Sequence, residues 1–389
     1  MPFSKCSGHS VQDSSPVEVR FHQTIAEVVP AEAAPAGVFL APGFIDIQVN
    51  GFAGVDYNSP LTTHEEIARS IGVLLSTGVT RFYPTVITGP PADMEAALRN
   101  LARARETLPD GEAIDGFHVE GPHISPEDGP RGAHPRQWVR PPDYDEFRRW
   151  QDATGGNIRI VTLSPEWPEA PRYIERIVAD GAVASIGHTK AESAQIEDAV
   201  HAGASLSTHL GNGAHQVMRR HPNYIWDQLA EDRLMADFIV DGVHLGANFL
   251  KSAIRGKTVG RSALVTDAST PAAARPGRYR LGEQEIELTE AGRVVLAGTD
   301  RLAGSALRMD RGVENLMRLA GITLPEAIRM ATTNAARAGR VPAREGGLVP
   351  GDRADLVQFR FDHAGPRIEV LATWLSGRPV YRADRPQAA

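Results

Sequence analysis

The middle of this 389-residue chain alternates apolar runs with amphipathic stretches, and this alternation limits the possible folds more than any other feature. The apolar runs are rich in β-branched residues, which is typical of buried strands. Eight such runs occur, at Gly43–Val49, Val79–Pro84, Gly116–Glu120, Ile158–Leu163, Val183–Gly187, Ser205–Leu210, Ala236–Asp241 and Ala263–Asp267. Helical periodicity lies between them, at Met94–Glu106, Arg172–Ala179, Ala191–His201 and Asn248–Ile254. Eight strands that alternate with helices predict an α/β fold, a (β/α)8 TIM-like barrel over residues 42–341.

A doubly wound open sheet is the alternative arrangement for such a pattern. No Gly-x-Gly-x-x-Gly motif follows the first strand, which disfavours the dinucleotide-binding form of that fold. Residues 272–300, with "RYRLGEQEIEL", predict a β-hairpin inserted between the last strand and its helix.

The two ends of the chain contain short β-like runs bounded by Gly and Pro. In the N-terminal region these runs are Val17–Phe21 and Ile25–Val29, followed by an Ala/Pro-rich connector. The C-terminal region gives similar runs from "GGLVPGDRADLVQF" to "WLSGRPVYR". We expect residues 1–41 and 342–389 to pair into one small β-sandwich domain.

Charge and cysteine content exclude several classes of partner. A formal net charge of −7, without a basic run longer than Arg-Arg-His, argues against nucleic-acid binding. No apolar run reaches the roughly 18 residues of a membrane span, so no membrane partner is expected. The single cysteine, Cys6, excludes an internal disulfide framework, and "MPFSKCSGHS" has no secretory h-region. These features predict a cytoplasmic protein.

Polar residues follow the predicted strands at the points where they end. They are Glu120, His188, His209, Asp241, His244 and Asp267. In a barrel these positions converge on the C-terminal rim, where barrel enzymes have their active sites. A carboxylate with two imidazoles leaves a coordination position for water, which is the composition of a catalytic metal site. Asp267 has the chemistry of the base that such hydrolysis needs, although each residue alone could be a helix cap or a core polar group.

At these residues the chain resembles the N-acetylglucosamine-6-phosphate deacetylase family of the amidohydrolase superfamily. The resemblance extends over roughly residues 40–380. The matching segments are "APGFIDIQVNGFAGVDYN", "FHVEGPHIS", "GAHP", "VTLSPE", "SIGHTKA", "STHLGN", "DGVHL", "LVTDAS", "LAGSAL" and "MATTNAARAGR".

The resemblance implies a barrel enzyme that removes acetate from the 2-acetamido group of a phosphorylated amino sugar. It implies one divalent metal ion held by Glu120, His188 and His209, with Asp267 as the general acid and base. Zn²⁺ is the first expectation, and Fe²⁺, Mn²⁺ or Co²⁺ would suit the same ligands. The residues that it assigns to substrate binding are Ala133, His134, Asn212, Gly213, Arg220, His244, Leu302, Ala303 and Gly304. Arg220 and His244 match phosphate contacts, and the histidine reaches across a dimer interface in family members, which implies a homodimer.

One segment departs from the family pattern. Members commonly have Tyr-Asn-Ala-Met after the "THL" histidine, whereas this chain has Gly-Asn-Gly-Ala-His at residues 211–215. The departure leaves the sugar and its phosphate open. His215 is additional and could contact ligand, but solvent exposure is the favoured expectation.

The stretch "GFIDIQVNG" carries Gln48 and Asn50 where two-metal members of the superfamily have His-x-His. The two amides share one face of a strand, because residues two apart point the same way. Amides are poor metal ligands beside imidazole, but they can orient a metal-bound water. We therefore expect a single metal, although a purely structural role for the amides is the alternative.

The expected function is hydrolysis of N-acetylglucosamine 6-phosphate to glucosamine 6-phosphate and acetate. An amidohydrolase acting on another N-acyl amino sugar or amino acid is one alternative. A non-catalytic binding protein with the same fold is another.

Overall fold

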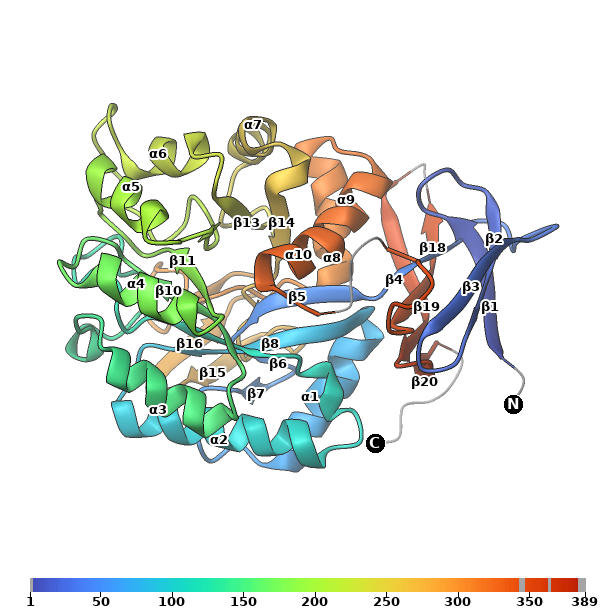
Figure 1. The fold of residues 1–389 in the computed structure, drawn as a ribbon, viewed down its shortest axis with the longest axis horizontal. Helices are drawn as coiled ribbons and strands as arrows, with labels where there is room; N and C mark the ends of the chain where they lie inside the picture. The colour runs from blue at the N-terminus through green and yellow to red at the C-terminus, as the bar shows by residue number, and fades with distance from the viewer. Residues whose placement is uncertain (1–2, 343–346, 363–364, 384–389) are drawn as a thin grey trace.

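Eight parallel strands form the central sheet of the structure, a computed structural model that describes residues 3–342, 347–362 and 365–383 (Figure 1). The strands are β5 (Phe44–Val49), β8 (Val79–Ile87), β9 (Phe117–Glu120), β10 (Ile158–Leu163), β11 (Val183–Ile186), β12 (Leu206–Ser207), β13 (Met235–Ile239) and β14 (Ser262–Val265). They are hydrogen-bonded in chain order, and a parallel bridge between Val49 and Ala268 joins the last to the first. The predicted (β/α)8 barrel is confirmed.

The barrel strands are buried on both faces. Every residue of β5 and of β8 is buried, as expected for parallel strands between an inner core and an outer ring of helices. Strand β12 is shorter than the run Ser205–Leu210 predicts. The reason is His209, whose φ of +31° takes the chain out of the extended conformation soon after the strand begins.

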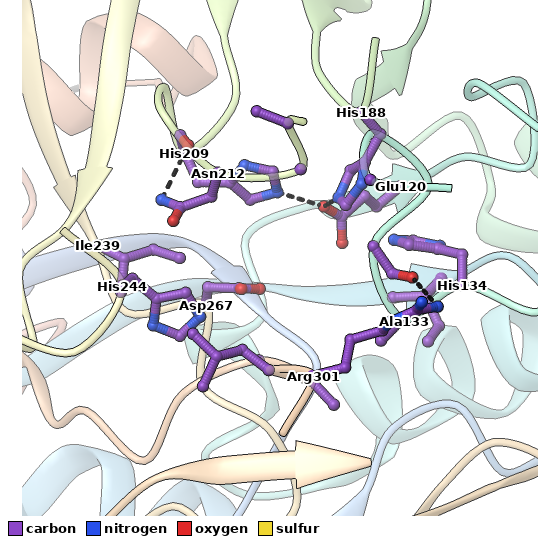
Figure 2. A pocket seen from close by; sticks show the side chains of 18 of the residues that line it. Glu120, Ala133, His134, His188, His209, Asn212, Ile239, His244, Asp267 and Arg301 are labelled. Carbon is purple, nitrogen blue, oxygen red and sulfur yellow. Dashed lines mark hydrogen bonds and ion pairs between the residues drawn. The ribbon is translucent and has the colours of Figure 1, made fainter. Parts of the chain in front are cut away.

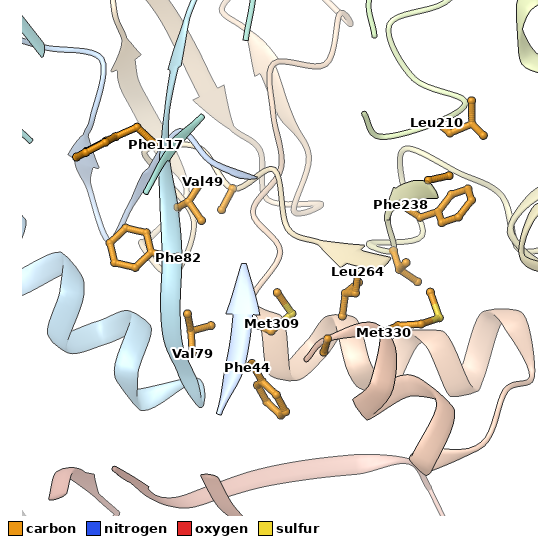
Figure 3. Close-up of a cluster of buried hydrophobic side chains, with 14 of the residues drawn as sticks. Phe44, Val49, Val79, Phe82, Phe117, Leu210, Phe238, Leu264, Met309 and Met330 are labelled. Carbon is orange, nitrogen blue, oxygen red and sulfur yellow. The ribbon is translucent and has the colours of Figure 1, made fainter. Parts of the chain in front are cut away.

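Helices cover the outside of the barrel (Figure 1). They are α1 (His64–Ser76), α2 (Pro91–Thr107), α3 (Tyr144–Thr154), α4 (Ala170–Ala179), α5 (Ser193–His201), α6 (Tyr224–Ala230), α7 (Ala247–Lys257), α8 (Met309–Asn315) with a π-helical continuation at Leu316–Ala320, α9 (Leu324–Met330) and α10 (Thr333–Gly339). Figure 3 shows Phe44, Leu264 and Met330 among the buried side chains that join the strands to these helices. Within the described residues, no helix is both long enough and apolar enough to cross a lipid bilayer.

The two chain ends meet in a separate seven-stranded sheet. Its strands are β1 (Ser4–Ser10), β2 (Pro16–Phe21), β3 (Ile25–Pro30), β4 (Val38–Pro42), β18 (Leu356–Asp362), β19 (Arg367–Leu375) and β20 (Arg378–Arg382). Strand β4 connects the two ends, because it pairs parallel with β1 and antiparallel with β18. Phe21, Leu40 and Trp374 belong to one buried cluster of this sheet. The pairing of the ends follows the prediction, whereas residues 1–2, 343–346, 363–364 and 384–389 of the expected domain lie outside the described part.

A buried arginine fixes this sheet to the barrel. Arg81, on β8, donates from Nε to Asp355 Oδ2 over 2.6 Å, and from Nη1 to Asp115 Oδ2 over 3.2 Å and to the carbonyl of Pro342 over 2.6 Å. Its side chain is 2% exposed and Asp355 is fully buried. The charges are therefore neutralised inside the junction between the two parts.

The inserted segment after β14 forms three antiparallel strands where a two-stranded hairpin was predicted. They are β15 (Gly277–Leu281), β16 (Gln284–Leu288) and β17 (Val294–Leu296). Ala303 donates its backbone N–H to Val294, so the chain returns alongside β17 towards the barrel rim. This insertion forms one wall of the cavity described below. A short antiparallel pair, β6 (Gly51–Phe52) and β7 (Val55–Asp56), follows β5.

Candidate active site

A cavity of about 700 Å³ opens at the carboxyl ends of the barrel strands. All of the site residues predicted from the sequence line it, except Gln48 and Arg220. Figure 2 shows Glu120, His188 and His209 on one side of this cavity, with Asp267 and His244 facing them.

Three of the polar residues that follow strands have left-handed backbone conformations. The φ angles are +48° at His188, +31° at His209 and +49° at Asp267. Non-glycine residues adopt this region infrequently, and such strained positions gather at functional sites. Here the three turns direct a side chain into the cavity just after β11, β12 and β14.

His188 and His209 both contact the same carboxylate oxygen of Glu120. Glu120 Oε1 lies 3.1 Å from His188 Nε2 and 2.7 Å from His209 Nε2. The Nδ1 atom of His188 is 2.8 Å from the carbonyl of Pro130, which fixes the ring so that Nε2 points to the carboxylate. All three side chains are buried.

The pKa values of this group reflect mutual stabilisation of opposite charges. Burial opposes the charge on Glu120, but the hydrogen bonds from His188 and His209 outweigh it and hold the pKa of Glu120 well below its usual value. Burial also opposes the charge on His209, yet its hydrogen bond with Glu120 raises the pKa of His209 to about 9. The cluster therefore favours a negative carboxylate that faces positive charge.

The donor set fits a divalent metal ion. Two imidazole nitrogens and a carboxylate oxygen converge, which is a suitable set for Zn²⁺ and similar cations and leaves a position for water. His134 lies beside this set, because one ligand atom each of Glu120, His134 and His188 lie within 4.8 Å of one another. Its Nδ1 is 2.8 Å from Thr88 Oγ1, and burial, then the charge of His188, lowers the pKa of His134 to about 3.

Gln48 and Asn50 contact Asp267 directly. Gln48 Nε2 lies 3.0 Å and Asn50 Nδ2 lies 2.7 Å from the same Oδ1 atom of Asp267. Burial, then the charge of Glu120, raises the pKa of Asp267 to about 6. The role of the amides in orienting a metal-bound water stays a prediction, and the observed contact adds a second role, which is to hold this carboxylate.

The predicted sugar-binding loops pack against these groups. A Cβ atom at Gly213, where φ is +54°, would lie 2.7 Å from Nδ1 of His188, so only glycine fits there. Asn212 donates its side-chain amide to the carbonyl of His209 over 3.1 Å. On the other wall, Ser305 donates its backbone N–H to the carbonyl of Asp267 over 2.9 Å, which places residues 302–304 beside the carboxylate.

The two predicted phosphate contacts lie in different surroundings. His244 lines the cavity of its own chain, with Nδ1 2.7 Å from Asp241 Oδ2. Arg220 is exposed on the loop between β12 and α6 and does not line this cavity. His244 therefore needs no second chain to reach a site, whereas Arg220 has no contact with the site of its own chain.

Several residues that line the cavity were not predicted from the sequence as site residues, among them His215, Arg293 and Arg301. His215 lines the cavity, with Nδ1 2.9 Å from Tyr224 Oη and Nε2 3.0 Å from Glu127 Oε1, and its side chain is 26% exposed, so it faces both the cavity and solvent. Arg293 and Arg301 also line it, from the inserted segment. The position of Arg301 directly before the "LAGSAL" segment was the available signal.

The sequence profile described as "Amidohydrolase family" matches residues 39–380. The chain belongs to the amidohydrolase family. This confirms the superfamily resemblance that the strand-end motifs indicated.

Relatives of this amidohydrolase share most of its length. The N-acetylglucosamine-6-phosphate deacetylase of Bacillus subtilis (strain 168) is 35% identical over 351 residues, covering 90% of this chain and 86% of the relative. The human protein of the same name is 34% identical over 360 residues, covering 90% and 85%. The crystal structure of N-acetyl-D-glucosamine-6-phosphate deacetylase from Mycobacterium smegmatis has a TM-score of 0.87 at 30% identity, over 97% of this chain and 100% of that chain.

Proposed function

We propose that this amidohydrolase hydrolyses the N-acetyl group of N-acetylglucosamine 6-phosphate to give glucosamine 6-phosphate and acetate. The observation that carries the proposal is that Asp267 shares one cavity with the convergent Glu120, His188 and His209, and that all four side chains are buried. The names of the relatives give the substrate class.

Glu120, His188 and His209 are the residues that would hold one divalent metal ion in this proposal, with Zn²⁺ first and Fe²⁺, Mn²⁺ or Co²⁺ as alternatives. Such an ion, when bound, polarises a substrate carbonyl and lowers the pKa of water. His134 lies next to these ligands, and its Nε2 is available to the acyl oxygen because Nδ1 is engaged by Thr88.

Asp267 moves the proton. Its carboxylate takes a proton from the water whose oxygen bonds to the acyl carbon, and returns it to the amine nitrogen as the C–N bond breaks. Oδ1 is occupied by the amides of Gln48 and Asn50, which leaves Oδ2 for this transfer. A pKa raised to about 6 suits a group that must both accept and release a proton near neutral pH.

Acetate release from N-acetylglucosamine 6-phosphate, measured before and after chelation, tests the proposal. We expect activity to be lost on chelation and restored by a divalent metal. Activity that resists chelation would rule out the metal mechanism. Metal analysis should give one ion per chain, and two ions with Gln48 coordinating one would overturn the single-metal assignment.

One observation favours a different N-acylated amino sugar as a second candidate. His215 enters the cavity from the segment at 211–215 that departs from the family pattern. A panel of phosphorylated and unphosphorylated N-acyl sugars, ranked by kcat/KM, separates the candidates.

We also infer a homodimer in the cytoplasm. The exposed Arg220 could serve the cavity of a second chain, and Val217 on the same loop is 89% exposed. The lone cysteine, Cys6, is free and buried, which suits a reducing compartment. Light scattering of the purified protein and fractionation of the source cells test these two statements.

A further inference from the structure

Four buried polar side chains lie across neighbouring strands of the barrel, just before the strand ends that carry the proposed metal ligands. They are His118 on β9, Thr162 on β10, Ser185 on β11 and Thr208, which directly follows β12. Each is at most 2% exposed, and none of them lines the cavity. We call these four residues the polar row.

The polar row lies next to an apolar layer of the barrel interior. Ile160, Val183 and Leu206, each two residues before a member of the row, belong to one buried cluster. Side chains two residues apart on a strand share a face, so the polar groups form the next layer towards the cavity. TIM barrels mostly fill such layers with branched apolar side chains, and a polar group buried there is costly unless it is hydrogen-bonded.

The four side chains form one continuous series of short hydrogen bonds. His118 Nε2 is 2.7 Å from Thr162 Oγ1, which is 2.7 Å from Thr208 Oγ1, which is in turn 2.5 Å from Ser185 Oγ. At the other end, His118 Nδ1 is 3.1 Å from the carbonyl oxygen of Ile47 on β5. This carbonyl can only accept, so Nδ1 carries a proton and Nε2 of the neutral ring accepts from Thr162. Thr208 then donates to Thr162, and Ser185 donates to Thr208.

Two of the proposed metal ligands follow members of the row along the chain. His118 is two residues before Glu120 and points to the same side of β9. Thr208 is the residue before His209, and its backbone N–H donates to the carbonyl of Ile186 over 2.9 Å. A shift of either side chain therefore moves a ligand, because at most two rigid peptide units separate them.

The third ligand is positioned by packing against the row. Gly187 directly precedes His188, and a Cβ atom added to Gly187 would lie 2.7 Å from Thr162 Cγ2 and 3.1 Å from Thr208 Cβ. The turn that carries His188 thus packs closely on the two threonines. Strand β10 supplies none of the three ligands, but it lies between β9 and β11 in the sheet. Thr162 therefore connects the strand of Glu120 with the strands of both histidines.

We propose that Thr162 is a positioning residue of the metal site, which through the polar row holds the three ligands at a fixed spacing before an ion binds. The inference rests on the metal site of the proposed function. A fully satisfied buried network is rigid, and a preorganised set of ligands binds a cation more tightly because less ordering remains to occur on binding. An apolar residue at position 162 would leave Nε2 of His118 and Oγ1 of Thr208 without one partner each.

Titration of Zn²⁺ into the metal-free protein, in competition with a chromophoric chelator, tests the proposal without relying on turnover. Thr162→Val keeps the shape of the side chain and removes the hydroxyl, so we expect the Kd for Zn²⁺ to rise about 10-fold or more. Thr162→Ser restores the hydroxyl and should bind Zn²⁺ almost as tightly as the wild type. At saturating Zn²⁺, KM for N-acetylglucosamine 6-phosphate should stay unchanged in both variants, because Thr162 does not line the cavity.

Thr77→Val is the matched control. Thr77 is 1% exposed, does not line the cavity, and donates its hydroxyl to the carbonyl of Leu74 over 2.7 Å at the end of α1. Its replacement should lower the free energy of unfolding, since a buried hydrogen bond is lost, and leave the Kd for Zn²⁺ unchanged. Thr208→Val repeats the test at the next member of the row, and it decides the question if Thr162→Val does not fold.

The outcomes separate this inference from the proposed function. Zn²⁺ binding as tight as wild type in both Thr162→Val and Thr208→Val overturns the positioning role, and so does equal weakening in Thr77→Val. A wild-type protein that binds Zn²⁺ but releases no acetate would refute the proposed substrate, while the Kd values of the variants still decide the role of Thr162. A wild-type protein that binds no divalent ion would overturn both.

Discussion

The side-chain amide of Asn50 donates to Oδ1 of Asp267 over 2.7 Å and so joins the first strand of the barrel to the end of the last. Gln48 donates to the same oxygen over 3.0 Å. Two neutral donors on one oxygen fix the plane of the carboxylate without adding charge. Gln48 and Asn50, which occupy the positions of the His-x-His pair of two-metal members, therefore contact Asp267, the proposed base.

Replacing Asn50 by alanine should lower kcat by about 10- to 100-fold, because Asp267 loses its shorter donor and its orientation. KM should change less, and the metal content should stay at the wild-type level. Kinetics combined with metal analysis measures both. Asn100→Ala, which removes a remote amide that bonds the carbonyl of Thr62, is the control. Loss of metal in Asn50→Ala would instead assign Asn50 to the metal site.

Asp267→Asn should lower kcat by about 10²- to 10⁴-fold, since the amide keeps the shape of the side chain but cannot accept the proton. The protein should still bind metal and glucosamine 6-phosphate. Acetate release, metal analysis and calorimetry provide the three measurements. A near-normal rate would remove Asp267 from the role of base.

Arg81→Ala should lower the free energy of unfolding by about 3–5 kcal/mol, because the buried carboxylate of Asp355 loses a partner. Urea unfolding followed by circular dichroism measures the change. Arg360→Ala is the control, as both Arg360 and Glu369 are 55% exposed and such pairs contribute little. Equal stabilities of the two variants would contradict a role for Arg81 at the junction of barrel and sheet.

Asp46 should make the protein less stable as pH rises from about 4 to about 7. Burial raises the pKa of Asp46 to about 7, although Thr266 donates to Oδ2 over 2.6 Å. In that range the folded state binds more protons than the unfolded state, so the free energy of unfolding falls with pH. The slope from one group is at most about 1.4 kcal/mol per pH unit.

Asp46→Asn should remove this contribution. The difference in unfolding free energy between wild type and variant is measured in urea at pH 5 and pH 7, where the other buried carboxyl groups are common to both proteins. A difference that stays constant between the two pH values would show that Asp46 does not titrate in this range.

The sequence predicted the elements whose signal is local. Ile158–Leu163 was placed to the residue, because its apolar run and its boundaries are both visible in the chain. Strand β4 was missed, since Val38–Pro42 follows an Ala/Pro-rich stretch and becomes a strand only through pairing with both chain ends. The predicted run Ser205–Leu210 is longer than strand β12, because no sequence feature indicates the turn at His209.

In the candidate site, too, some residues could be predicted from local sequence, whereas others depend on tertiary packing. Positions at strand ends identified Glu120, His188 and Asp267 correctly as cavity residues. The contact between Asn50 and Asp267 was not foreseen, because it depends on how the barrel closes. Arg301 falls between the predicted hairpin at 272–300 and the "LAGSAL" segment, and its position on the cavity wall depends on tertiary packing that the sequence does not show.

The barrel closes between Val49 and Ala268, so the active site can be completed only late in the synthesis of the chain. Asn50 and Asp267 are 217 residues apart, so a chain emerging from the ribosome presents the amide long before its carboxylate partner exists. A partly synthesised or truncated chain lacks the oriented carboxylate of Asp267, the proposed base, even when Glu120, His188 and His209 are already present. Hydrolytic competence arises only when the last strand docks on the first.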